Sequence, residues 1–273
     1  MKMNDITASV IDSFSQTEDP RLQEILSSLV KHLHAFAQDV KLTEAEWFRG
    51  IEFMTAVGQK CDDKRQEFIL LSDVFGLSML TVSMNNDRPK ACTESTVFGP
   101  FYVDNAPHYE NGEDVSNGAT GTPCVVQGSV KNSHGQPIAN AVIDVWQADD
   151  EGFYDVQKAN LSHAQARGVL HSRPDGTFNF NSIVAEAYPI PMDGPVGSML
   201  EATHRSPWRP AHLHFMIRAD GYDTLITHVF KKGDPYLTSD PVFGVKESLV
   251  ADWVTGEDGL TTLHFDFVLN AVQ

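Results

Sequence analysis

The sequence predicts a mainly β protein, in which an α-helical N-terminal domain precedes a β-sandwich domain. Apolar residues recur at helical spacing over the first ninety or so residues, whereas after about Lys90 Gly and Pro become frequent and the apolar period changes to two. A chain of 273 residues with 41% hydrophobic residues can bury a sizeable core. We place the helical domain at residues 1–95, with a linker to about residue 123, and the β-sandwich domain at residues 96–273.

Three segments account for the helical prediction. Residues 21–40 carry an amphipathic stripe, and Thr43 with Glu46 forms a capping-box pattern that begins a second helix. Residues 65–84 are apolar on nearly all sides, so this helix is either buried or faces a partner subunit as well as its own core. Asp73 is the exception within it. It lies at the helix surface or a local break, or it points into a pocket.

Short segments separated by Gly, Asn and Asp turns follow, and such a series of strands suggests a β-sandwich. The intervening residues 91–123 are irregular but aromatic, so we expect them to pack along the β domain. The expected strands are residues 124–130, 141–147, 177–184, 212–218, 224–230 and 261–269.

Composition excludes several classes of protein. A net charge of −17 without a Lys/Arg run argues against nucleic-acid binding, which needs a basic face. The three cysteines are widely spaced and form no CxxC pair, which indicates a reducing compartment. Neither a signal peptide nor a membrane-spanning apolar stretch is recognisable. We therefore expect a cytoplasmic protein without membrane insertion.

His212 and His214 are the sharpest local signal of chemistry. Residues i and i+2 of a strand point to the same face, so the two imidazoles form half a metal site unless they are exposed on an edge strand. A zinc hydrolase of the His-x-His-x-Asp type needs an acid where Met216 stands. In a cupin, His228 could be the third histidine, but no Glu follows His214 closely. Phenolate is a remaining ligand type, and this hard anionic donor suits a trivalent cation.

Residues 151–154 (EGFY), 188–197 (YPIPMDGPVG) and 208–214 (WRPAHLH) resemble the intradiol ring-cleavage dioxygenases, as does the run 94–102 (ESTVFGPFY). The resemblance covers nearly the whole chain, and the helical domain excludes the protocatechuate branch. It implies a β-sandwich with one Fe(III) per subunit, and helices that form a homodimer interface around a bound phospholipid. The implied iron ligands are Tyr154, Tyr188, His212 and His214.

The same resemblance implies a reaction of O₂ with a vicinal aromatic diol, which cleaves the ring between the two hydroxyls. Tyr188 is then a catalytic residue that leaves the metal and accepts a substrate proton, while Tyr154 stays bound. Arg209, taken alone, could form a surface ion pair. The resemblance favours a catalytic cation beside the ring, where it stabilises charge that develops during attack.

His228 stands where the catechol branch commonly has Gln, and with residues 97–101 and Asp73 it resembles the hydroxyquinol 1,2-dioxygenases. A buried Asp73 would bond a third ring hydroxyl, and the product would be 3-hydroxy-cis,cis-muconate, the enol form of maleylacetate. Catechol or a substituted catechol is the alternative substrate. A non-catalytic transthyretin-like binding module is a remote alternative, suggested by residues 127–142. The implied substrate pocket comprises Leu70, Asp73, Val97, Phe98, Gly99, Pro100, Phe101, Ile190, Pro191, Arg209 and Val242.

Overall fold

The structure is a computed structural model that describes residues 3–62 and 65–272. The chain forms two compact units, Met1–Ala56 and Val57–Gln273. The first unit is helical, and the second contains further helices and all of the described strands. The domain boundary near residue 95 stays a prediction.

The first unit contains α1 (Met3–Asp12), α2 (Pro20–Asp39) and most of α3 (Glu44–Lys60). The predicted capping box at the start of α3 is confirmed, because the Thr43 amide donates to Glu46 (2.9 Å) and the Glu46 amide donates to the Thr43 hydroxyl (3.3 Å). The helices predicted there are therefore confirmed.

The apolar stripe of α2 is uncovered in the single chain. None of the described side chains of α2 is buried. Leu29 and Leu33 are each 57% exposed and Phe36 is 52% exposed, and Trp47 of α3 is 56% exposed. Large apolar side chains gathered on a helical unit in this way are typical of an interaction surface.

The predicted helix over residues 65–84 is wrong as a single helix, because it is two: α4 (Glu67–Val74) and α5 (Leu77–Asn85), bent by 77°. Gly76 has φ +73°, a left-handed conformation that ends α4 and redirects the chain. No single helix within residues 3–62 and 65–272 is long and apolar enough to cross a membrane. Within these residues, only α4 and α5 taken together meet the length and apolarity criteria, and this pair is bent.

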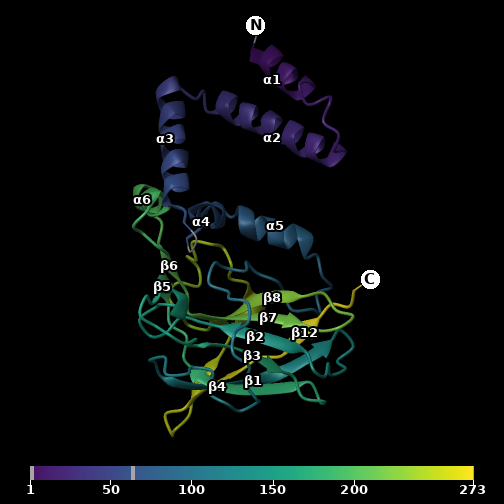
Figure 1. Cartoon of the computed structure of the whole chain (residues 1–273), viewed down its shortest axis with the longest axis vertical. Helices are drawn as coiled ribbons and strands as arrows, with labels where there is room; N and C mark the ends of the chain where they lie inside the picture. The colour runs from purple at the N-terminus through teal and green to yellow at the C-terminus, as the bar shows by residue number, and fades with distance from the viewer. Residues whose placement is uncertain (1–2, 63–64, 273) are drawn as a thin grey trace. The chain divides into compact units, whose positions relative to one another are not determined.

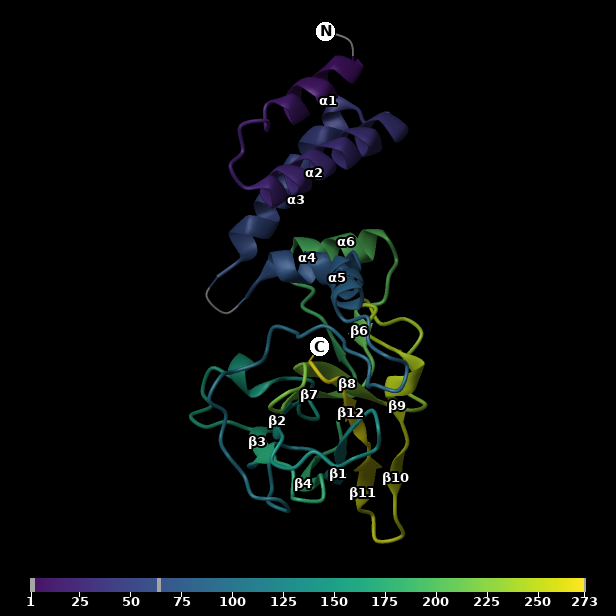
Figure 2. The ribbon, with the colours of Figure 1, turned by 90° about the vertical axis from the view of Figure 1, so that its right-hand side faces the viewer.

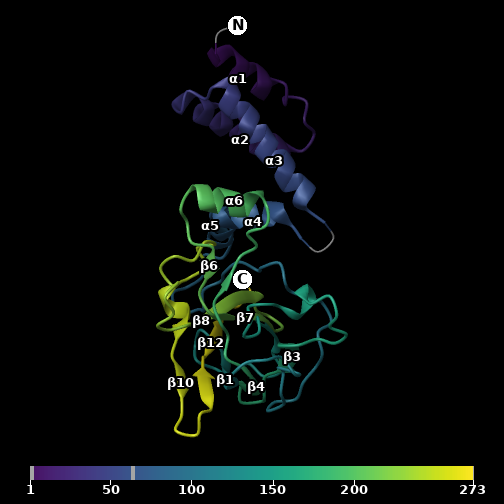
Figure 3. The ribbon, with the colours of Figure 1, turned by 90° about the vertical axis from the view of Figure 1, so that its left-hand side faces the viewer.

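Some apolar side chains of α4 and α5 are buried and others are exposed. Leu71, Val74 and Met79 are buried, whereas Phe75 is 65% and Leu77 57% exposed. A further helix that the sequence did not predict, α6 (Pro195–Ala202), lies beside α4 (Figures 2 and 3).

Two mixed sheets form the β part of the second unit, with a short β5–β6 ladder beside them (Figure 1). One sheet has the order β10-β11-β1-β12 with β4 paired to β1, and the other has the order β3-β2-β7-β8-β9. The strands are β1 (Pro123–Asn132), β2 (Val142–Trp146), β3 (Arg167–His171), β4 (Thr177–Ile183), β5 (Tyr188–Pro189), β6 (Trp208–Arg209), β7 (His212–Arg218), β8 (Leu225–Lys231), β9 (Val250–Ala251), β10 (Trp253–Thr255), β11 (Thr261–His264) and β12 (Phe267–Leu269).

Aromatic side chains join the two sheets across the core. The ring of Phe215 on β7 lies 6.4 Å from that of Phe178 on β4 and 4.6 Å from that of Phe267 on β12. All three are buried in one apolar cluster that draws on both sheets. The predicted β-sandwich is therefore confirmed, although the predicted strand 261–269 is two strands and β3, β5, β6, β9 and β10 were not predicted.

The segment 91–123 packs along the sandwich, as expected. The Thr93 amide donates to the Val268 carbonyl (2.9 Å), and the Tyr109 amide donates to the Val169 carbonyl (2.9 Å). Its main chain thus extends hydrogen bonding from both sheets, which explains why so irregular a segment is ordered.

A buried ion pair fastens the chain just after Tyr154. Arg167 Nε donates to both carboxylate oxygens of Asp155 (2.9 and 2.7 Å), and the two side chains are only 3% and 6% exposed. Arg167 Nη1 also donates to the Phe101 carbonyl (2.9 Å). The pair therefore joins β3, the 3-10 helix η1 (Asp155–Gln157) and the loop around Phe101.

Asp155→Ala should lower the free energy of unfolding by about 3–5 kcal/mol, because it leaves the Arg167 charge buried without a partner. Urea denaturation followed by circular dichroism would measure this. Asp252→Ala is the matched control, since its pair with Lys232 is 66% and 62% exposed and should matter far less. Equal losses in the two variants would contradict the prediction.

Candidate metal centre

Strand alternation in β7 sorts its side chains between two environments. Leu213, Phe215 and Ile217 enter the core between the sheets. His212 and His214 therefore point to the other side, where each is 1% exposed. The sequence predicted this shared face, and the alternative of an exposed edge strand is excluded because β7 lies between β2 and β8.

A tight turn after β2 places Tyr154. Asp149 Oδ1 accepts from the amides of Glu151 and Phe153 (3.0 Å each), which fixes the turn. Gly152 has φ +82°, and a Cβ there would lie 2.7 Å from Tyr188 Cβ. Only glycine therefore lets this turn approach the Tyr188 segment closely enough to bring the two phenols together.

Tyr188 and Arg209 are neighbours across the β5–β6 ladder, where they form a register pair. Tyr188 is 6% exposed, whereas Tyr154 is fully buried under the stacked ring of Phe101, with ring centroids 4.4 Å apart. The two phenols therefore differ in environment, and of the two only Tyr188 lines the neighbouring cavity.

The four donor atoms converge on one point. Tyr154 Oη lies 3.1 Å from Tyr188 Oη and 2.8 Å from His214 Nε2, and the two histidine Nε2 atoms are 3.2 Å apart. His212 Nε2 is 3.5 Å from each phenol oxygen. Donors about 2.1 Å from one ion would be about 3.0 to 3.4 Å apart, so this cluster fits a single metal ion.

Burial sets the protonation states of this cluster. Burial and the charge of Arg209 lower the pKa of His212 to about 3, and burial also lowers the pKa of His214 well below its usual value. His212 Nδ1 donates to the Pro210 carbonyl (2.7 Å), which leaves its Nε2 lone pair free for a metal. Burial raises the pKa of Tyr154 well above 10, so a bound cation must supply the stabilisation that its phenolate requires.

His228 supports His214 from behind. His228 Nε2 lies 2.8 Å from His214 Nδ1, and His228 Nδ1 lies 2.9 Å from the Thr96 hydroxyl. The nitrogens of His212, His214 and His228 fall within 4.8 Å of one another. His228 nevertheless meets the nitrogen of His214 that faces away from the phenols, so we assign it to orienting His214 rather than to the donor set.

Strand register brings these residues together. His214 on β7 pairs with Trp146 on β2 and with His228 on β8. The Trp146 ring stacks on His214 with centroids 4.7 Å apart. On the remaining side, a Cβ at Gly99 (φ +79°) would lie 3.2 Å from His214 Cε1. The imidazole of His214 is thus enclosed and held in one orientation.

A cavity of about 680 Å³ opens beside Tyr188 and Arg209. It is lined by every residue of the predicted substrate pocket except Phe98, whose ring packs on Tyr102 (centroids 4.8 Å apart) and Trp146 (5.9 Å). Further residues that were not predicted to line it also do so: Arg65, Gln66, Glu67, Ile69, Tyr102, Val156, Gln157 and Ala159.

Asp73 is buried, at 6% exposure, in the last turn of α4 and lines this cavity. Burial raises the pKa of its carboxyl, while the Ser78 hydroxyl and the charge of Arg209 oppose the rise. A polar group in this position is costly unless a hydrogen-bonding partner satisfies it.

Arg209 is a buried cation with a matching carboxylate. Its Nε donates to Asp240 Oδ1 (3.1 Å), and its Nη1 lies 3.2 Å from His212 Nε2. Burial opposes the charge of Arg209, but Asp240 together with Tyr188 and Tyr154 raises the arginine pKa. Asp240 also accepts from the amides of Val242 (3.3 Å) and Gly244 (3.0 Å). No sequence motif marked Asp240, and it was not predicted.

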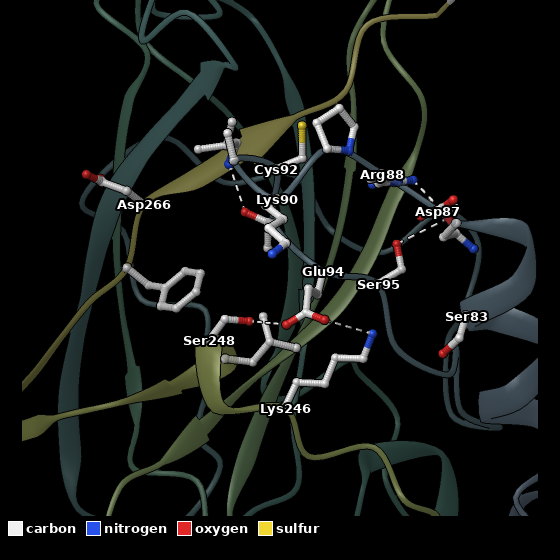
Figure 4. A pocket seen from close by; sticks show the side chains of 17 residues that line it. Ser83, Asp87, Arg88, Lys90, Cys92, Glu94, Ser95, Lys246, Ser248 and Asp266 are labelled. Atoms are coloured by element: carbon white, nitrogen blue, oxygen red, sulfur yellow. Dashed lines mark hydrogen bonds and ion pairs between the residues drawn. The ribbon is translucent and has the colours of Figure 1, made fainter.

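A second cavity of about 730 Å³ lies between the segment 83–95 and the C-terminal strands (Figure 4). Its central carboxylate is already satisfied, because Glu94 pairs with Lys246 (3.3 Å) and accepts from Ser248. It contains none of the converging donors described above.

The fold and the converging donors define a β-sandwich protein with a buried metal centre. Residues 97–271 match the family model described as Dioxygenase, and residues 19–93 match that described as Catechol dioxygenase N terminus. The chain therefore belongs to the intradiol ring-cleavage dioxygenases, as its motifs predicted.

Individual relatives agree. The chain is 61% identical to 6-chlorohydroxyquinol 1,2-dioxygenase of Cupriavidus pinatubonensis, over 98% of this chain and 97% of the relative. It is 52% identical to hydroxyquinol 1,2-dioxygenase of Rhodococcus opacus, over 93% and 85% respectively. The crystal structure of hydroxyquinol 1,2-dioxygenase from Pseudomonas putida DLL-E4 superposes with a TM-score of 0.93 at 45% identity, covering 99% of both chains.

His228→Leu should weaken metal binding by about 10- to 100-fold, because it removes the group that orients His214. His228→Gln is the matched control, since an amide can bond both His214 Nδ1 and the Thr96 hydroxyl, and it should bind metal nearly as the parent does. Metal content after competition with a chelator measures the effect. Parent-like metal binding by His228→Leu would contradict the orienting role.

Proposed function

We propose that this chain is a non-haem iron(III) dioxygenase that opens the ring of hydroxyquinol between its two adjacent hydroxyls. The observation that carries the proposal is the convergence of two phenol oxygens and two imidazole nitrogens beside a cavity with a buried cation and a buried carboxyl. Tyr154, Tyr188, His212 and His214 are the proposed ligands.

Iron(III) is the metal that this donor set favours. Phenolate is a hard anionic oxygen donor, and a trivalent cation stabilises it against the burial that otherwise raises the pKa of Tyr154. When bound, iron(III) supplies a Lewis acid that both adjacent substrate oxygens coordinate and that activates the ring toward O₂.

Tyr188 is the proposed proton acceptor of the pair of tyrosines. It lines the cavity where a diol would arrive, so its phenolate oxygen can take a proton from a substrate hydroxyl. Tyr154 is fully buried and stacked under Phe101, so it has little freedom to move. This difference supports a mobile role for Tyr188 and a fixed role for Tyr154.

Arg209 is proposed to stabilise negative charge on the ring as O₂ attacks. Its guanidinium lines the cavity, is held by Asp240 and lies next to Tyr188 across the β5–β6 ladder. A fixed, buried cation stabilises charge without having to reorganise, and at 4% exposure the side chain of Arg209 is little screened by solvent.

Hydroxyquinol is the proposed substrate because Asp73 offers a partner to a third ring hydroxyl. Catechol lacks that hydroxyl and would leave the buried carboxyl without a partner on the ring, although Ser78 still bonds it. Relatives at 61% and 52% identity carry names that specify hydroxyquinol or its 6-chloro derivative, which supports the same substrate class here. The proposed product is 3-hydroxy-cis,cis-muconate, the enol form of maleylacetate.

We further propose that the exposed apolar side chains of α2 and α3 form a homodimer interface around a bound phospholipid. Leu29, Leu33 and Trp47, each more than half exposed, support an apolar contact there. A cytoplasmic location is proposed from the free thiols of Cys61, Cys92 and Cys124.

The purified iron-loaded protein should absorb visible light through tyrosinate-to-iron(III) charge transfer, and anaerobic hydroxyquinol should shift that band as the diol chelates. Admission of ¹⁸O₂ should then give a product that contains both oxygen atoms, which mass spectrometry detects. The Tyr154→Phe variant serves as a control that removes one phenolate. Iron-loaded protein that stays colourless would overturn the proposed site.

Asp73→Leu should lower kcat/KM for hydroxyquinol by about 10- to 100-fold, in line with about 1.5–3 kcal/mol for a hydrogen bond to a charged group, and should leave catechol turnover nearly unchanged. Asp73→Asn, which can still bond a hydroxyl, should lose less. Paired kinetics on the two substrates measure the selectivity. A parallel loss on both would argue against the role of Asp73.

A further inference from the structure

Arg205 joins two walls of the cavity. Its Nη1 donates to the Val74 carbonyl (2.7 Å), and its Nη2 donates to the Pro241 carbonyl (3.0 Å). Val74 follows Asp73 on α4, and Pro241 precedes Val242 in the loop 240–244. One guanidinium therefore connects the direct neighbours of two residues that line the cavity from segments far apart in the sequence.

The bonds made by Arg205 are structural. Its guanidinium donates both of these hydrogen bonds to main-chain carbonyls. The Val74 carbonyl is among the last of α4, which a helix leaves without an intrahelical donor, and a cation is favourable there. The planar guanidinium fork can serve two carbonyls in a fixed relation, which a lysine ammonium cannot reproduce.

Both ends of this connection are rigid. The Arg205 amide donates to the Leu200 carbonyl (3.0 Å), which fixes its main chain to the end of α6. The guanidinium also lies 5.3 Å from the ring centroid of Phe243, which has the left-handed value φ +57°. The Phe243 ring packs against Gly76, where a Cβ would lie 3.4 Å from it.

The loop 240–244 links Arg205 to the side chains of the site. Its Asp240 holds Arg209, and its Val242 packs with Met79 and Val97 at the cavity wall. A change in the position of this loop relative to α4 would therefore alter the space between Val242 and Asp73. The four converging donors belong to other segments, β5, β7 and the turn after β2, so we expect their main chain to stay in place.

We propose that Arg205 is a positioning residue for substrate selectivity, which fixes the separation of the Asp73 wall from the Val242 wall. The inference rests on the proposed function, because it assumes that Asp73 bonds a ring substituent. Arg205 does not line the cavity, so its effect is indirect. Loss of the two hydrogen bonds made by the Arg205 guanidinium should weaken the fit of hydroxyquinol more than that of catechol, since only hydroxyquinol has the third hydroxyl that bonds Asp73.

The test compares Arg205→Met with the parent in kcat and KM on hydroxyquinol and catechol, together with the absorption band of the substrate-free iron enzyme. The preference for hydroxyquinol should fall by about tenfold, chiefly through KM, because misplacement by about 1 Å can cost up to about a hundredfold. The absorption band should not change. Arg88→Met is the matched control, since Arg88 also donates to a main-chain carbonyl, that of Thr224 (2.8 Å), but the neighbours of Thr224 do not line this cavity. It should retain the parent preference.

An unchanged preference in Arg205→Met, or an equal loss on both substrates, would overturn the proposal. If that variant does not fold, Arg205→Lys replaces it: a reduced preference supports the fork, and the parent preference overturns it. Failure of the proposed function would look different, because the parent enzyme itself would then lack the absorption band or the preference for hydroxyquinol.

Discussion

The crowding of four buried donor groups into one small space is the constraint on which the rest of this structure depends. Burial lowers the pKa of His212 and raises the pKa of Tyr154, so it favours the neutral imidazole and the neutral phenol, and a bound cation is needed to stabilise the Tyr154 phenolate. The surrounding structure holds the four donor groups close together even though burial disfavours their charged forms. Strand register encloses His214 between Trp146 and His228, and Gly152 lets the turn of Tyr154 approach Tyr188.

What the sequence could predict of this site was the part encoded locally. The shared face of His212 and His214 follows from the alternation of one strand, and the structure has it. The two tyrosines had no such signal, because Tyr154 lies in a turn and Tyr188 on a two-residue strand, and only the family motifs pointed to them. The roles of Trp146 and His228 depend on which strands pair and in what register, and this is a non-local property.

The helices show the same division between local and tertiary information. Caps and apolar periodicity predicted α2 and α3, but the apolar pattern of residues 65–84 continues through the bend and hid the break at Gly76. A single glycine is weak evidence against a helix, since it costs only about 1 kcal/mol there. The break matters to the site because it ends α4 directly after Asp73. Asp240 was missed for a related reason: its partner Arg209 is distant in sequence.

Two parts of the fold form the cavity, and they tolerate substitutions to different extents. The donors and Arg209 belong to strands and tight turns that interlock, so a larger side chain at Gly152 would collide with Tyr188. Another wall belongs to α4 and to Val242, whose side chains line the cavity without holding the donors, whereas Asp240 beside Val242 holds Arg209 and belongs with the interlocked part. Laboratory evolution confined to that wall could therefore explore new ring substituents while the catalytic apparatus stays intact, and libraries that extend into the glycine turns would consist largely of inactive clones.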